Sequence, residues 1–206
     1  MGIFAVLAAV IITVATGTPL HASDIVTKPE WSVGDWWILG NYRYTVVERH
    51  GDSYEMVRTI ESSSRQSDTP ADNGSRGRMA IDGWISEYTD TDGSLKKVLE
   101  DSRHQWIRFP MAVGNRWTFN VLSRSRTMGA STRFDYDCQA ARWEELELAG
   151  RSIRSLRIEC QSGTRDSLTR WRHTVWYAPE AKRYVKLVSH YDGGPTLTCS
   201  GWSVKP

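Results

Sequence analysis

The chain contains 206 residues, with 26 Lys or Arg against 24 Asp or Glu, and carries a formal net charge of +2 at pH 7. A charge this close to zero excludes any inference of a nucleic-acid or membrane-surface partner from charge alone. Aromatic residues make up 11% of the chain and include ten Trp, which supply enough apolar surface for a sizeable core.

An apolar segment opens the chain. It runs from Met1 to Val14, continues into Thr16-Gly17-Thr18-Pro19, and is followed by Leu20-His21-Ala22 just before Ser23. A short apolar stretch, then Gly and Pro, then a small residue is typical of a secretory signal peptide. We expect residues 1–22 to be a signal peptide, or a membrane anchor if they are not removed. The protein is then periplasmic or secreted.

A short motif occurs twice in the chain. Val33-Gly34 is followed by Trp37, and Val113-Gly114 is followed by Trp117, each with a Pro shortly before the Val. Each copy is typical of a turn that leads into a strand anchored by a buried Trp. The recurrence predicts two related halves, residues 23–108 and 109–206, packed as one domain.

Alternation of apolar and polar residues predicts hairpins in the first half. Residues 42–49 and 53–60 flank the turn His50-Gly51-Asp52. Residues 83–89 and 94–100 flank Asp92-Gly93, a strong local hairpin signal. The acidic residues of that second turn resemble a calcium loop only superficially, because the Gly comes too early and no Glu closes the loop.

Two strands of the second half carry one Cys each. The first alternates through Phe134, Tyr136 and Cys138, and the second through Leu156, Ile158 and Cys160. If Leu148-Ala149-Gly150 form a three-residue hairpin loop, Cys138 lies directly opposite Cys160 on the apolar face. In an oxidising compartment we expect a disulfide there, with two buried free thiols as the alternative. Cys199 is interpreted as a buried free thiol.

The last part of the chain continues the same pattern. Strands are expected at 170–177, at 184–190 and around 197–199, and no helical periodicity exceeds two turns. The predicted fold class is mainly β, an antiparallel up-and-down curved sheet, open or a half barrel, built from two related halves.

Three stretches together resemble a group of exported bacterial proteins of unknown function. They are Phe109-Pro110 with the second Val-Gly-Trp motif, the hairpin tip from Glu145 to Gly150, and Trp176-Tyr177-Ala178-Pro179 leading to Val185-Lys186. The tip departs from that group, because Leu148 stands in place of a Pro. Such proteins are distantly similar to periplasmic carriers of the LolA and LppX type, and this resemblance implies a curved sheet able to hold a lipid-like ligand.

Few residues suggest chemistry. His173 and His190 are expected to meet across the last hairpin, but no third ligand has a spacing that would complete a metal site. Glu144, Glu145 and Glu147 are interpreted as a solvated strand face rather than a glycosidase pair. We therefore predict no catalytic residues, no metal and no cofactor, and a protein that is not an enzyme.

The favoured hypothesis is a non-catalytic exported binding protein whose concave sheet face accepts an apolar or lipid-like ligand. Trp84, Trp117 and Trp176 are the candidate ligand-binding residues. The alternative is a structural or protein-interaction module of the cell envelope with a filled core. The partner is then an apolar small molecule or an envelope protein, with no nucleic acid and no membrane contact except through an uncleaved N-terminal segment.

Overall fold

A computed structural model describes residues 24–61, 75–80, 87–89, 95–98, 105–124, 131–163, 170–191 and 193–206. The N-terminal segment predicted as a signal peptide and the residue Trp84 lie outside these described ranges. Among the described residues, we find no helix with the length and apolar character needed to cross a membrane.

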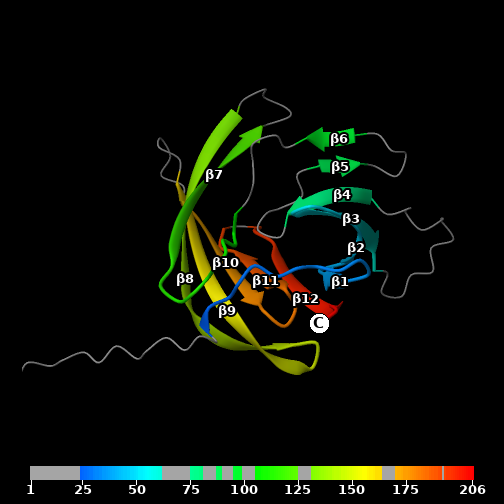
Figure 1. Cartoon of the computed structure of the whole chain (residues 1–206). Coiled ribbons are helices and arrows are strands. Elements are labelled where there is room, and N and C mark those ends of the chain that lie inside the picture. Colours follow the sequence, from blue (N-terminus) through cyan, green and yellow to red (C-terminus); the bar gives the residue numbers. More distant parts are fainter. Residues whose placement is uncertain are drawn as a thin grey trace, which may run out of the picture.

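The described chain is built from β-strands, as its alternating sequence predicts. The strands are β1 (Trp36–Leu39), β2 (Tyr42–His50), β3 (Ser53–Ile60), β4 (Ser75–Ala80), β5 (Glu87–Thr89), β6 (Leu95–Val98), β7 (Arg116–Arg124), β8 (Ser131–Leu148), β9 (Arg151–Gly163), β10 (Arg170–Ala178), β11 (Arg183–Ser189) and β12 (Thr196–Ser203). They form a single 12-stranded antiparallel sheet that is curved but not closed (Figure 1). The predicted fold class is confirmed.

The strand order explains how the two halves of the chain meet. It runs β6-β5-β4-β3-β2-β1-β12-β11-β10-β9-β8-β7, so consecutive strands pair except β6 and β7, and β1 also pairs with β12. An up-and-down barrel closes by pairing its first and last strands. Here that pair is present, and the sheet is instead open between β6 and β7, which are its two edges (Figure 1).

The repeated motif forms the same turn in both halves. The backbone N–H of Gly34 donates to Val46 O at 2.9 Å, and that of Gly114 donates to Ala140 O at 2.8 Å. Both glycines have a positive φ, 93° and 92° respectively, which residues with a side chain rarely adopt. Each turn leads directly into a strand, β1 in the first half and β7 in the second.

The side chain that closes each turn is also equivalent. The Asp35 carboxylate accepts a bond from Ser32 N at 2.8 Å, and Asn115 Oδ1 accepts one from Ala112 N at 2.7 Å. An Asp or Asn side chain that bonds nearby backbone in this way stabilises a turn. The two copies therefore repeat in structure as well as in sequence.

The hairpin of β8 and β9 brings the two cysteines together. Cys138 lies opposite Cys160, and the two residues form a disulfide with Cα atoms 4.1 Å apart. The predicted pairing is confirmed, but the predicted three-residue loop is wrong. The loop is a two-residue turn, Ala149-Gly150, with φ angles of 52° and 75° that fit a type I′ turn. A bulge between Ala140 and Arg142 then shifts the register by one residue and restores the cysteine pair.

Two clusters of buried side chains form the core. The first covers one face of β7–β11 and includes Trp106 and Met111 from the segment before β7. Trp106 packs its ring against Phe119, Tyr136 and His173, with centroids 5.4, 5.1 and 4.7 Å away. The second cluster joins β1–β4 to the β8–β9 turn and to β10 and β11. The interior is thus filled by side chains from both halves.

Replacement of Gly114 by Ala tests the repeated turn. It should lower the free energy of unfolding by about 1–2 kcal/mol, because Ala at this positive φ is strained. The control is Gly163→Ala, where open space surrounds the added methyl group and no positive φ occurs, and it should be neutral or raise stability by about 0.4–1 kcal/mol. Urea denaturation measures the stability of both variants. Equal midpoints would contradict the idea that the positive φ at position 114 requires Gly.

Removal of the disulfide tests its contribution to stability. The double variant C138A/C160A should lose about 3 kcal/mol of unfolding free energy, because the bridge closes a loop with a sequence separation of 22 residues. A reducing agent should lower the thermal midpoint of the wild type and leave that of the double variant unchanged. If the reducing agent lowered the thermal midpoints of both proteins equally, its effect would not come from the Cys138–Cys160 disulfide.

Candidate functional site

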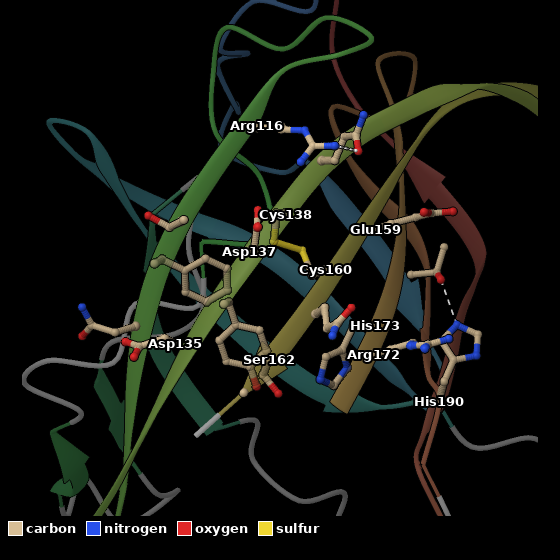
Figure 2. A pocket seen from close by; sticks show the side chains of 18 of the residues that line it. Arg116, Asp135, Asp137, Cys138, Glu159, Cys160, Ser162, Arg172, His173 and His190 are labelled. Atoms are coloured by element: carbon tan, nitrogen blue, oxygen red, sulfur yellow. Dashed lines mark hydrogen bonds between the residues drawn. A yellow bond between two sulfur atoms is a disulfide. The ribbon is translucent and has the colours of Figure 1, made fainter. Parts of the chain in front are cut away.

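A hollow of about 1200 Å³ lies over β7, β8, β9 and β10 (Figure 2). Along β7, β8 and β9, exposed side chains that line it alternate with buried ones, and some of the buried residues, Cys138 and Cys160 among them, line it as well. Arg116, Asp137 and Glu159 are exposed, whereas Trp117, Cys138 and Cys160 are buried. Because neighbouring residues of a strand point to opposite faces, the charged side chains share the face that turns away from the first core cluster.

The hollow is lined mainly by polar and charged side chains. On this face they are Arg116, Thr118, Asn120, Asp135, Asp137, Gln139, Arg157, Glu159, Gln161, Arg172, Thr174 and His190. Some are paired, since Arg116 donates to Gln139 at 2.9 Å and Arg157 to Glu159 at 2.8 Å. Lining of this kind suits a polar partner better than an apolar one.

Three exposed charges of the hollow have no such pairing. Within the described part of the chain, no hydrogen bond or ion pair joins Asp135, Asp137 or Arg172 to another side chain. These residues come from β8 and β10 and lie on two sides of the hollow (Figure 2). Their charges are therefore available to water or to a partner.

A partly buried edge of the same face contains Glu144. Its Oε2 accepts a hydrogen bond from Trp176 Nε1 at 2.7 Å, and its Oε1 accepts bonds from Arg157 at 3.1 Å and Arg142 at 2.7 Å. Burial alone would raise the pKa of Glu144, but these three donors outweigh it and lower the pKa to about 2. The carboxylate stays ionised and holds Trp176 in place.

The two described tryptophans of the predicted ligand site lie apart. Trp117 belongs to the first core cluster, is 5% exposed and donates its Nε1–H to Gln105 O at 2.8 Å. Trp176 belongs to the second cluster and is 7% exposed. Neither lines the hollow, and each indole N–H already has an acceptor inside the protein. Their role in binding an apolar ligand stays a prediction.

The expected meeting of His173 and His190 is wrong. His173 lies opposite Ser189, because β10 and β11 are joined by a turn at 179–182 and carry a register shift near Trp176. His173 Nδ1 is 3.0 Å from Ser189 Oγ, whereas His190 Nε2 is 2.8 Å from Thr174 Oγ1. The two imidazoles thus have different hydroxyl partners.

The contact between Thr174 and His190 has the composition of a nucleophile and a base, but not the arrangement. Thr174 is only 4% exposed, although it lines the hollow. Among the described residues, no carboxylate bonds to His190 to orient its ring. Nucleophilic catalysis needs an accessible nucleophile, a base and a group that orients the base, all within reach of one another.

Arg183, at the start of β11, is a buried cation. It is 3% exposed, and its guanidinium carbon lies 5.0–5.6 Å from the ring centres of four aromatic residues, Trp31, Trp37, Tyr44 and Tyr184. Within the described ranges it has no carboxylate partner, and its Nε has no hydrogen-bond acceptor. The aromatic faces partly offset the cost of burying the charge. No local pattern predicts this site, because Arg183 follows a turn and has the sequence context of a solvent-exposed residue.

The third cysteine is inert in this environment. Cys199 is a buried free thiol, as predicted, and its Sγ lies 3.2 Å from Gly201 O. Burial raises the pKa of the Cys199 thiol. Its role is therefore that of a small apolar core residue.

No family model matches the chain, and no curated protein matches it either. Two solved structures are similar in outline. One is the hypothetical lipoprotein YmcC from Escherichia coli K12, with 11% identity, a TM-score of 0.47 and 84% of each chain covered. The other is a protein with a YmcC-like fold from Bacteroides fragilis, with 10% identity, a TM-score of 0.41 and coverage of 87% of this chain and 98% of that one.

Glu144 makes stability depend on pH. Because its pKa falls from 4.5 to about 2 on folding, its contribution is complete above pH 4.5 and is lost as the pH falls toward 2. The variant Glu144→Gln should flatten the fall in unfolding free energy over this range, by at most about 1.4 kcal/mol per pH unit. The control is Glu145→Gln, an exposed neighbour on the opposite face, which should keep the wild-type slope. Urea denaturation at several pH values measures the slopes, and equal slopes would contradict the assignment.

Proposed function

We propose that this chain is a non-catalytic, exported protein of the cell envelope that binds a polar partner on the open face of β7–β10. The observation that carries the proposal is the contrast between a filled interior and a polar hollow on the solvent side. The interior is closed by Trp106, Trp117 and Trp176, which are all buried. The hollow instead offers charges of both signs at Asp135, Asp137 and Arg172, among others.

Mixed, unpaired charges favour a polypeptide or another polar partner. Such a partner presents donors, acceptors and charges of both signs, which the hollow can match in register and orientation. An enclosed apolar ligand would need a cavity lined by apolar side chains with only a few polar groups. The described hollow has apolar lining at Phe119, Tyr136, Cys138 and Cys160, but most of its lining residues are polar or charged.

Two observations support export. The apolar N-terminal segment has the order of a secretory signal peptide. The bridge between Cys138 and Cys160 is of the kind that persists in an oxidising compartment. The proposed location is the periplasm or the outside of the cell.

A second candidate function is favoured by Arg183. A buried cation with no carboxylate partner among the described residues would gain a counter-ion from an anionic amphiphile that enters between β2 and β11. Tyr44 and Tyr184, which flank the guanidinium, are only partly buried and would contact such a ligand. In this candidate the ligand is lipid-like, as expected from the sequence, but Arg183 binds it instead of the tryptophans.

Site-specific cross-linking combined with lipid extraction separates the two candidates. A photoreactive residue at Asp137, in the hollow, should give a discrete adduct with one partner in cells that naturally produce the protein. The same residue at Ser152, which is also exposed but lies at the β8–β9 turn, should give none. The organic extract of the purified protein should contain no stoichiometric lipid.

The opposite pattern would overturn the first proposal. A stoichiometric anionic lipid in the extract, lost in the variant Arg183→Met, would favour the second candidate. Equal adducts at the two positions would show that the hollow is not a specific binding face.

A further inference from the structure

Three potential metal ligands gather on the outer face of the β2–β3 hairpin. They are Glu48, His50 and Glu55, and their ligand atoms all lie within 4.8 Å of one another. His50 Nε2 is 3.6 Å from Glu48 Oε2 and 3.7 Å from Glu55 Oε2. These residues lie outside the hollow and take no part in the function proposed above.

The hairpin register places these side chains together. The turn Gly51-Asp52 sets His50 opposite Ser53 and Glu48 directly opposite Glu55. Glu48 and His50 are two residues apart on β2, so they point to the same face. On β3 the neighbours of Glu55 are Tyr54 and Met56, which are buried on the other face, and Glu55 therefore shares the outer face with Glu48.

This arrangement requires a positive charge. Two carboxylates directly opposite each other on paired strands repel and destabilise the hairpin. Arg76 supplies part of it, because its Nη1 lies 3.0 Å from Oε1 of Glu55, and Arg78 lies directly opposite Glu55 on β4. That contact also orients Glu55, so that its Oε2 faces His50. In metal sites, a residue that does not bind the ion itself commonly orients a ligand in this way.

The imidazole nitrogen that lies between the two carboxylates makes no hydrogen bond among the described residues. His50 Nε2 has almost no solvent exposure and no hydrogen-bond partner among the described residues. The distances of 3.6 and 3.7 Å to the carboxylate oxygens are too long for hydrogen bonds. They approach the spacing of about 3.4 Å between neighbouring ligands of a tetrahedral Zn²⁺ ion with ligand distances of about 2.0–2.1 Å.

We propose that Glu48, His50 and Glu55 form a binding site for a divalent metal ion, with Zn²⁺ the best match. One imidazole nitrogen and two carboxylate oxygens are ligands that Zn²⁺ accepts, and three protein ligands leave a fourth position for water. The ion would neutralise the facing carboxylates and occupy the space into which Nε2 points. The side chain of Glu48 is 62% exposed, so the ion would enter from solvent.

Equilibrium dialysis tests the site. The full chain, first freed of metal with a chelator, is dialysed against ZnCl₂ at neutral pH, and bound zinc is counted. We expect one Zn²⁺ per chain at micromolar free zinc, and a visible absorption spectrum typical of tetrahedral coordination when Co²⁺ replaces Zn²⁺. The variants His50→Ala and Glu55→Gln should each weaken zinc binding by about 10-fold or more.

A matched control and a folding check keep the test decisive. His190→Ala removes another exposed histidine, far from β2 and β3 in sequence, and should bind zinc as the wild type does. Glu55→Gln keeps the shape of the side chain, so its metal-free thermal midpoint should stay close to that of the wild type even if His50→Ala fails to fold. The proposal is overturned if the wild type binds no zinc, if His50→Ala and Glu55→Gln bind it unchanged, or if the cobalt spectrum is octahedral.

Discussion

The pairing of β1 with β12 is the interaction on which the rest of the structure depends. It sets Trp36 opposite Ser203 and Trp37 opposite Trp202, and it joins the two halves of the chain into one sheet. The C-terminal residues strengthen the joint, since Lys205 N donates to Asp35 Oδ1 at 2.9 Å and Lys205 Nζ donates to Val33 O at 2.7 Å. The first copy of the repeated turn is therefore held by the end of the chain.

The same joint explains why the interior is filled. Trp31 and Trp37 donate their indole N–H groups to Lys182 O at 2.9 Å and Ala181 O at 2.7 Å, so the turn between β10 and β11 docks on the first half. On the other side, Val26 and Met111 exchange two backbone hydrogen bonds of 2.7 and 2.8 Å, which fix the chain before β1 to the second copy of the turn. These contacts on two sides hold the halves together around the buried side chains.

The sequence was informative where a feature depends on local pattern. Alternation predicted the sheet, and the repeated Val-Gly motif predicted two equivalent turns because only Gly adopts their positive φ readily.

Strand register was harder to predict, because a bulge has no single-residue signature. The cysteine pair was found because a loop drawn one residue too long and an unseen bulge near Ala141 compensated each other. A three-residue turn His50-Gly51-Asp52 does not predict the group of Glu48, His50 and Glu55. The observed two-residue turn Gly51-Asp52 sets Glu48 opposite Glu55. Arg183 could not be found from sequence, since its aromatic neighbours come from both halves.

Native-state hydrogen exchange of β1 and β12 tests the central claim that the two halves form one cooperative sheet. We expect the backbone amides of this pair, those of Trp37 and Leu39 among them, to exchange only through global unfolding, with the same free energy as the protected amides of β8 and β9. Exchange of the β1 and β12 amides at a much lower free energy than those of β8 and β9 would show two separately stable halves and would contradict the account.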